Sequence, residues 1–254
     1  MANFVKLDES KFPKTKGKRI DGMRFYEVDG KAYPSITTVL GSLPKPGLDK
    51  WRESVGEEAA KWEMNRAARR GKVTHTLVEE YLKGQTPSTR DVLPLGLFAL
   101  LKPYLAQIDN VHCLETILYS KKLTVAGQVD CIAEYNGKLS VIDFKTANKE
   151  RNDEWNKNYY MQTAAYAVMY EELFGTPIDQ IVILMASEDG AGRVFIKDKA
   201  EYLPELEKAI QHFYKYYQEA RQSYYEKLST FATFGRGWTR RVDETTQLAK
   251  TMIS

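Results

Sequence analysis

Two aspartates and a lysine lie close together in this sequence, Asp130 followed by Asp143 and Lys145. Between the aspartates, Asn136-Gly137 separates two runs of strand-forming residues, and Asn-Gly is the strongest short signal for a two-residue hairpin turn. A turn at that place sets the register so that Asp130 is opposite Asp143. Directly opposed residues have Cβ atoms roughly 4.5–5.5 Å apart. The sequence therefore predicts two facing carboxylates with a lysine one step along.

The hairpin also predicts which side chains are buried, because side chains alternate between the two faces of a strand. One face is apolar and is expected to pack on the core; it carries Val129, Cys131, Ile142 and Phe144. The opposite face carries Gln128, Asp130, Ile132, Val141, Asp143 and Lys145. The two aspartates and the lysine are thus expected on the same face of the hairpin.

A pair of facing carboxylates indicates a cation site. Two aspartates at that separation repel each other unless one is protonated or a cation lies between them. Carboxylate oxygens with room for water suit Mg²⁺ or Mn²⁺. The alternatives are a solvent-facing hairpin that binds nothing, or a pairing shifted by one residue. A shift would expose Val129 and Phe144 and bury the charges, so the metal site is the favoured hypothesis.

The same residues resemble a known family. Asp130, twelve intervening residues and then Asp143-Phe144-Lys145 resemble the two-part motif of the PD-(D/E)XK nuclease superfamily. The lead-in Gly127-Gln128-Val129-Asp130 is similar to its RecB-like branch, to which mitochondrial and phage exonucleases belong.

Two flanking motifs extend the resemblance to roughly residues 33–175. Downstream, Gln162 and Tyr166 resemble the Q-x-x-x-Y motif of that branch. Upstream, Arg70-Gly71 and His75 resemble its helical histidine motif. Four short motifs in the right order are more specific than any one of them.

The resemblance implies an α/β fold with a mixed central β-sheet flanked by helices, as in restriction endonucleases, with N- and C-terminal helical additions. It also implies a deoxyribonuclease that hydrolyses phosphodiester bonds with one or two Mg²⁺ or Mn²⁺ ions. The residue pattern assigns Asp130 and Asp143 as ligands, and the resemblance adds His75 and the main-chain carbonyl of Phe144. Lys145 would then orient or deprotonate the attacking water and stabilise the developing negative charge. By resemblance, Gln162 and Tyr166 hold the DNA backbone or help to pre-organise Lys145.

Three functions compete on these residues. The favoured one is a DNA exonuclease that prefers single-stranded or open DNA ends, in DNA repair or recombination. The second is a structure- or sequence-specific endonuclease on the same fold. The third is a DNA-binding protein with a vestigial nuclease site, against which the intact Asp130, Asp143 and Lys145 argue. No Walker-type phosphate-binding motif occurs, so an ATP site is not expected in this chain, and a helicase or recombination partner would supply that activity.

The charge of the chain is informative in its distribution. The net charge is only +3, but basic residues form three clusters. These are Lys11, Lys14, Lys16, Lys18 and Arg19; Arg66, Arg69, Arg70 and Lys72; and Arg236, Arg240 and Arg241. Any one cluster alone is more typical of a solvated surface. Together they favour a phosphate-binding surface, and the resemblance implies DNA as the partner. Arg70 and Lys72, beside the histidine motif, are the predicted phosphate contacts.

Length and composition indicate one folded domain. A chain of 254 residues with 43% hydrophobic content can bury one core, so we expect a basic arm over residues 1–22, a nuclease domain over 23–230 and a tail over 231–254. No segment has the length of apolar residues that a membrane helix or signal peptide needs, which predicts a cytoplasmic protein of a bacterial host or phage-infected cell and leaves a mitochondrial one open. Cys113 and Cys131 are expected as buried free thiols.

Helical periodicity positions the histidine. Residues 48–83 show a helical pattern interrupted near Gly71, with an apolar stripe at Trp51, Val55, Ala59 and Trp62. Glu79 shares a face with His75 and is predicted either to orient the imidazole or to form a simple helix ion pair. Glu115, on a predicted strand over 113–120, either approaches the site or is an exposed strand glutamate, and the exposed glutamate is the favoured interpretation. Further helices are expected over 95–108, 156–174 and 201–225, hairpins around Asp29-Gly30 and Asp189-Gly190, and a short helix capped by Ser35.

Overall fold

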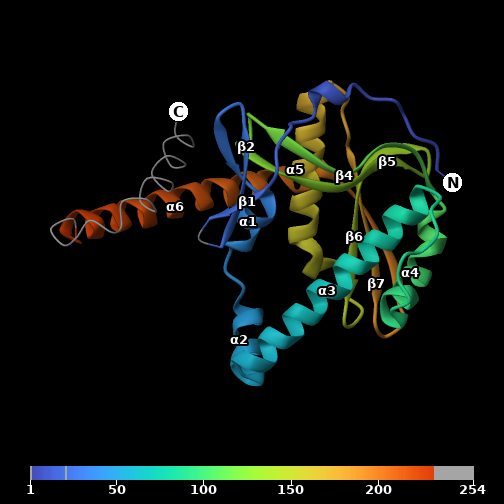
Figure 1. Cartoon of the computed structure of the whole chain (residues 1–254), viewed down its shortest axis with the longest axis horizontal. Helices are drawn as coiled ribbons and strands as arrows, with labels where there is room; N and C mark the ends of the chain where they lie inside the picture. Colours follow the sequence, from blue (N-terminus) through green and yellow to red (C-terminus); the bar gives the residue numbers. More distant parts are fainter. Residues whose placement is uncertain (1, 21, 232–254) are drawn as a thin grey trace.

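The computed structural model describes residues 2–20 and 22–231, and their arrangement is shown in Figure 1. A small antiparallel sheet contains β1 (Lys18–Ile20), β2 (Met23–Val28) and β3 (Lys31–Pro34). A larger sheet has the order β4-β5-β6-β7-β8, with β4 (Ile108–Ser120), β5 (Val125–Tyr135), β6 (Lys138–Ala147), β7 (Gln180–Ser187) and β8 (Gly192–Asp198). Only β6 and β7 pair in parallel within it. The larger sheet is therefore mixed, as predicted.

Six α-helices accompany these sheets in the described residues. They are α1 (Ile36–Gly41), α2 (Pro46–Val55), α3 (Glu57–Leu82), α4 (Val92–Leu105), α5 (Lys157–Phe174) and α6 (Leu203–Phe231). Three short 3₁₀ helices cover Glu9–Lys11, Asp153–Asn156 and Lys199–Glu201. The α/β fold with helices around a mixed central sheet is confirmed. The N-terminal addition contains the small sheet as well as helices.

Both faces of the larger sheet are buried under helices. On one face, Cys131, Ile142 and Phe144 pack with α3 and α4. On the other face, Ile132 and Val141 pack with α1, α5 and α6. The alternation predicted only the first of these two cores, because a strand covered on both sides is apolar on both.

One strand residue departs from the predicted partition. Val129 belongs to the core under α5, whereas Cys131, two residues further along β5, belongs to the core under α3 and α4. The side-chain alternation is thus irregular around Asp130, the residue between them.

The central hairpin has the predicted turn and register. Asn136 and Gly137 both have positive φ, 52° and 76°, as a type I′ turn requires. The paired residues run from Tyr135–Lys138 to Cys131–Ile142. Beyond that pair β5 continues on β4 and β6 continues on β7, so the two strands no longer pair with each other. Asp130 and Asp143 are the first residues past this parting point, so the predicted pair of directly opposed aspartates is not formed.

The histidine helix is continuous through Gly71, contrary to the predicted interruption. The chain breaks instead at Gly56, between α2 and α3, where φ is 83°. In Figure 1, α2 lies at the lower end of the molecule, away from both sheets. No residue of α2 is buried, and the Trp62 side chain is 63% exposed. The apolar stripe correctly predicted a helix. It did not predict whether its side chains are buried, because periodicity carries no information about another element that would cover them.

The N-terminal residues contact the body of the protein. The main chains of Asn3 and Val5 hydrogen-bond to Val111 of β4, and β1 pairs with β2, so much of the predicted arm is paired with the body. Residues 232–254, which make up nearly all of the predicted tail, lie outside the described residues. Both cysteines are buried free thiols. Within the described part of the chain, no helix combines the length and apolar character needed to cross a bilayer.

Candidate active site

The parting of β5 and β6 leaves main-chain groups of Phe144 available to side chains. Its N–H donates to Asp130 Oδ2 at 3.0 Å. Its carbonyl oxygen lies 2.6 Å from Nε2 of His75, which comes from α3. The end of the β5–β6 ladder therefore brings together an aspartate, a histidine and a main-chain oxygen that the sequence places up to 69 residues apart.

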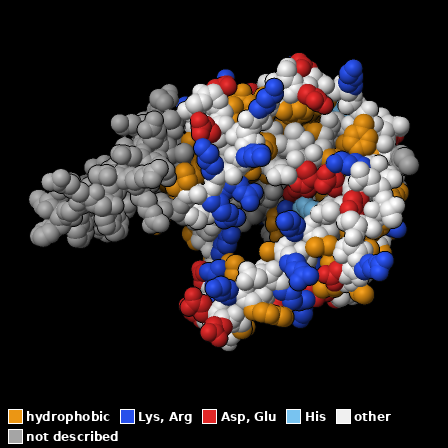
Figure 2. Space-filling model, viewed as in Figure 1, with side chains coloured by type: hydrophobic (Ala, Val, Ile, Leu, Met, Phe, Trp, Pro, Cys, Tyr) orange, Lys and Arg blue, Asp and Glu red, His pale blue; other side chains and the backbone are white. Residues whose placement is uncertain are grey.

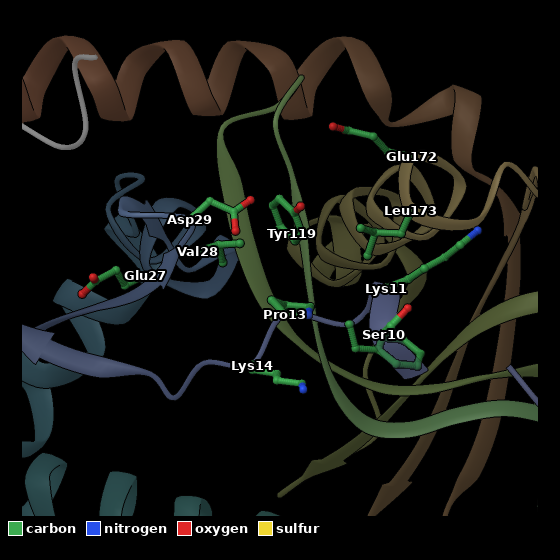
Figure 3. A pocket seen from close by; sticks show the side chains of 11 residues that line it. Ser10, Lys11, Pro13, Lys14, Glu27, Val28, Asp29, Tyr119, Glu172 and Leu173 are labelled. Carbon is green, nitrogen blue, oxygen red and sulfur yellow. The ribbon is translucent and has the colours of Figure 1, made fainter. Parts of the chain in front are cut away.

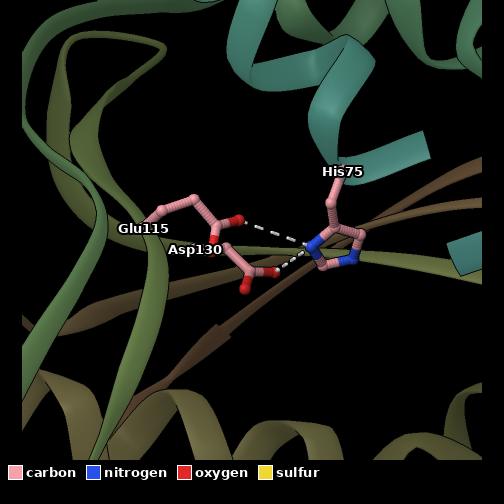
Figure 4. Close-up of side chains that lie close together, drawn as sticks. All are labelled: His75, Glu115 and Asp130. Carbon is pink, nitrogen blue, oxygen red and sulfur yellow. Dashed lines mark ion pairs between the residues drawn. The ribbon is translucent and has the colours of Figure 1, made fainter. Parts of the chain in front are cut away.

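The imidazole of His75 has a defined orientation. A carbonyl oxygen can only accept a hydrogen bond, so Nε2 carries the proton that is donated to Phe144. Nδ1 then faces two carboxylates, with Asp130 Oδ2 at 3.5 Å and Glu115 Oε1 at 3.7 Å (Figure 4). A carbonyl that fixes one nitrogen of a histidine leaves the other directed at a cation. In this arrangement the Phe144 carbonyl orients the ring, and its role as a ligand stays a prediction.

Glu115 is a candidate site residue for which the sequence favoured the wrong alternative, an exposed glutamate. Its carboxylate lies in the cluster with His75, not free in solvent as expected. Its backbone has φ 46°, unusual for glutamate, and Gln128 Nε2 donates to its Oε2 at 2.7 Å. Leu114 pairs with Cys131 and Thr116 with Val129, so Glu115 is level with Asp130 on the neighbouring strand. The β4–β5 register was the signal that could have revealed it.

Three of these side chains fit a divalent cation. The ligand atoms of His75, Glu115 and Asp130 all lie within 4.8 Å of one another. Burial lowers the pKa of His75, but the carboxylates of Asp130 and Glu115 outweigh it and raise that pKa to about 9. The pocket thus favours positive charge. Two carboxylates and an imidazole are ligands that Mn²⁺ and Mg²⁺ accept.

Asp143 lies beside this group and has other partners. Its Oδ2 is 2.5 Å from Lys145 Nζ as an ion pair, without hydrogen-bond geometry, and its Oδ1 accepts from Gln162 Nε2 at 3.3 Å. Burial raises the pKa of the Asp143 carboxyl, and the nearby Lys145 ammonium opposes that rise. Burial lowers the pKa of Lys145, but Asp143 and Asp130 raise it more. The pair therefore keeps the lysine charged inside the protein.

Gln162 and Tyr166 have different surroundings in the structure. Gln162, on α5, reaches Asp143 directly. Tyr166 is 1% exposed, and a Cβ atom built at Gly127 would lie 2.8 Å from its ring. The glycine in the lead-in therefore allows close packing of α5 on β5. Burial of Tyr166 favours the pre-organising role of this pair over contact with the DNA backbone.

Arg70 and Lys72 differ in the same way. Arg70 is 4% exposed at its side chain, and its guanidinium is bonded to Thr146, Asn148 and Glu188. These contacts join α3 to the ends of β6 and β7, which favours a structural role over the predicted phosphate contact. Lys72 is exposed and lines a hollow of about 450 Å³ that also includes His75 and Glu115.

The structure distinguishes between the two predicted roles of Glu79 in α3. Glu79 pairs with Lys83 at 2.6 Å, so the helix ion pair is the arrangement present.

In Figure 2, acidic side chains and a histidine lie at the rim of a hollow that is also bordered by Lys and Arg. The third basic cluster, Arg236, Arg240 and Arg241, lies outside the described residues.

The first basic cluster borders a different hollow, of about 560 Å³, shown in Figure 3. Lys11 and Lys14 line it together with the carboxylates of Glu27, Asp29 and Glu172. This mixed charge does not single out a phosphate. Of the two predicted phosphate contacts, Lys72 is the exposed one that lines the hollow beside His75.

Known proteins share this sequence pattern. A model of the PD-(D/E)XK nuclease superfamily matches residues 48–240. Over 173 residues the chain is 29% identical to mitochondrial genome maintenance exonuclease 1 of Mus musculus, covering 62% of this chain and 51% of that protein. The Homo sapiens protein is 29% identical over 172 residues, with 62% and 50% covered. The chain thus spans about half the length of the curated relatives it matches.

A solved structure also aligns with the chain. It is a protein from Eubacterium rectale named as an exonuclease, with a TM-score of 0.44 and 12% identity. The alignment covers 59% of this chain and 66% of that one.

Proposed function

This chain belongs to the PD-(D/E)XK nuclease superfamily, and we propose that it is a metal-dependent DNA exonuclease acting at single-stranded or open DNA ends. One observation carries the proposal. The parting of β5 and β6 brings Asp130, His75 and Glu115 together, next to the Asp143–Lys145 pair. The relatives named as exonucleases support an activity that starts from DNA ends.

A divalent cation has ligands ready in this site. His75, Glu115 and Asp130 would hold it. Asp143, from the pattern of carboxylates, and the Phe144 carbonyl, from the resemblance, are the further proposed ligands. When bound, Mg²⁺ or Mn²⁺ neutralises phosphate charge and lowers the pKa of water. Imidazole suits Mn²⁺ better than Mg²⁺, so Mn²⁺ is expected to bind more tightly.

Lys145 is the proposed catalytic lysine. Its ammonium lies near the end of β6, beside the candidate metal ligands and in an ion pair with Asp143. The raised pKa of Lys145 keeps this ammonium charged. A buried cation at a fixed position stabilises the negative charge that develops on the phosphate, without reorganisation of solvent. It also donates hydrogen bonds that orient the attacking water. Gln162 holds Asp143, and through it the lysine, in place.

DNA is the proposed partner, with Lys72 contacting a phosphate along the hollow beside His75. The sequence contains no Walker-type motif, so ATP-driven unwinding is assigned to a separate helicase or recombination protein. The proposed place of action is a bacterial or phage-infected cytoplasm, or the mitochondrion in which the named relatives act.

The test is digestion of labelled DNA by the full chain. We expect linear DNA carrying an end label to be degraded with Mg²⁺ or Mn²⁺, single strands faster than duplex, and no degradation with EDTA. Closed circular DNA of the same sequence should survive. The Asp143→Asn variant serves as the matched inactive control for contaminating nucleases.

Two outcomes would contradict the proposal. Cleavage of closed circles would show an endonuclease on this fold. DNA binding without cleavage under every metal condition would show a binding protein with a vestigial site.

A further inference from the structure

Lys145 has a second contact besides Asp143. Its Nζ lies 4.8 Å from the centre of the Tyr159 ring. Tyr159 belongs to the first turn of α5, three residues before Gln162. Residues three apart are neighbours on a helix surface, and residues two apart share a face of a strand. One face of α5 thus places Gln162 against Asp143 and Tyr159 against Lys145.

The Tyr159 ring is itself held in place. Arg151 NH1 donates to the Tyr159 hydroxyl at 2.9 Å, and the guanidinium carbon lies 5.6 Å from the ring centre. The main-chain oxygen of Tyr159 accepts from Thr163 Oγ1 at 2.9 Å. Arg151 therefore contacts the hydroxyl and the face of the ring, and Thr163 bonds the main chain of the same residue.

A lysine needs such a surface to act at one position. Its side chain has four rotatable bonds, and its ammonium does not have the rigid planar geometry of arginine. An aromatic face attracts the ammonium without taking its proton or cancelling its charge. With Asp143 engaged by a cation, Lys145 loses much of the attraction of that carboxylate. The ring then remains as the contact that holds the ammonium at the site.

We propose that Tyr159 is a positioning residue for Lys145, which confines the ammonium to the side of the site where phosphate is bound. This inference rests on the proposed nuclease function and goes beyond it, because Tyr159 lies outside the motif residues Gln162 and Tyr166. Its action passes entirely through Lys145. It therefore predicts an effect on the rate of the chemical step and none on DNA affinity.

The test compares two substitutions in the full chain. Tyr159→Phe keeps the ring and removes the hydroxyl, whereas Tyr159→Leu removes the ring. The rate at saturating single-stranded DNA should fall roughly ten- to thirtyfold in Tyr159→Leu, the size of a desolvated cation–π contact. Tyr159→Phe should retain most of the rate, and the affinity for DNA in Ca²⁺ should be unchanged in both.

Matched variants separate positioning from general damage. Tyr216→Leu removes a 63% exposed tyrosine of α6 and should behave as wild type. Arg151→Gln removes the hydrogen bond to the hydroxyl and the guanidinium beside the ring but keeps the ring itself, and should match Tyr159→Phe. This variant keeps the inference testable if Tyr159→Leu does not fold, because a thirtyfold loss in Arg151→Gln would contradict a role for the ring alone.

The outcomes distinguish this inference from the function on which it rests. An active wild type with an equally fast Tyr159→Leu variant overturns the positioning role and leaves the nuclease proposal intact. Rate and affinity falling in equal proportion would make Tyr159 a DNA contact, which also overturns it. A wild type that cleaves no DNA overturns both.

Discussion

Nε2 of His75 and the main-chain oxygen of Phe144 lie 2.6 Å apart, although 69 residues separate them in the chain. The contact forms because β5 and β6 stop pairing after Cys131 and Ile142, which leaves the carbonyl to the helix. The candidate metal ligands thus depend on a break in the ladder as much as on their own side chains.

Metal binding should stabilise the folded chain through Glu115. An ion that binds only the folded state contributes about 2.7 kcal/mol at a hundredfold excess over its Kd. For a chain of this size that is a rise of roughly 5–10 °C in Tm. Glu115→Gln should reduce the rise with Mn²⁺, measured by thermal denaturation. Glu79→Gln is the matched control, since Glu79 pairs with Lys83, and an equal response in both variants would remove Glu115 from the ligand set.

Lys145→Ala should lose turnover and keep affinity. A positioned cation that acts on the transition state contributes about 10²- to 10⁴-fold to rate. Single-turnover cleavage in Mg²⁺ should fall by this factor, while binding in Ca²⁺ should change little. If affinity and rate fell together, Lys145 would be a phosphate contact and not the catalytic lysine.

Arg70→Ala should unfold more easily without weakening DNA contacts selectively. Its loss removes the buried partner of Glu188 and the hydrogen bonds to Thr146 and Asn148. Arg66 still pairs with Glu188, so the expected cost is about 1–3 kcal/mol. Urea denaturation measures this. Arg69→Ala is the control: its side chain is 82% exposed and should change stability by less than about 0.5 kcal/mol. Equal stabilities would return Arg70 to the predicted phosphate-binding role.

Lys72→Ala should weaken DNA binding equally for all sequences. One lost phosphate contact reduces the log–log salt slope by roughly 0.7 on single strands. Fluorescence anisotropy in Ca²⁺ at several salt concentrations gives this slope. Lys83→Ala removes a lysine of the same charge at the end of α3 and should keep the wild-type slope. A slope unchanged in Lys72→Ala would exclude that lysine from the DNA path.

Gly127→Ala should destabilise the chain through Tyr166. The new methyl group would lie 2.8 Å from a ring carbon and 2.9 Å from the hydroxyl of a buried side chain, and such overpacking costs about 1–3 kcal/mol. Gly96→Ala is the control, because nothing lies within 4 Å of its added Cβ on α4 and helical alanine is favoured. A Gly127→Ala variant as stable as wild type would show that α5 is not seated on β5 through this contact.

Local chemistry explains what the sequence predicts well. Asn136 and Gly137 determine the turn by their own backbone preferences, and the register follows from the turn alone. The glycine at 175, with φ 72°, ends α5 as predicted for the same reason. That register brings Asp130, Asp143 and Lys145 to the same end of the hairpin, just past its last pair.

The remainder depends on partners distant in sequence. Arg70 is paired with Glu188, 118 residues away, and nothing near Arg70 indicates that partner. Glu115 reaches the site through the β4–β5 register and an unusual φ angle, neither of which its own neighbours determine. Lys145 lies near Asp143, as its place two residues along β6 allows, whereas the approach of His75 to Asp130 depends on how α3 packs on the sheet.

Phe144 contributes to the structure in two independent ways, through its ring and through its main-chain oxygen. Its ring fills the core and is 3% exposed, while its oxygen belongs to the main chain and is present whatever the side chain. A substitution at this position changes the volume of the side chain, and the packing of the core limits that volume. The oxygen remains in place as long as β6 stays paired with β7 through Leu184. Proline is excluded at this position, because it lacks the N–H group that donates a hydrogen bond to Asp130.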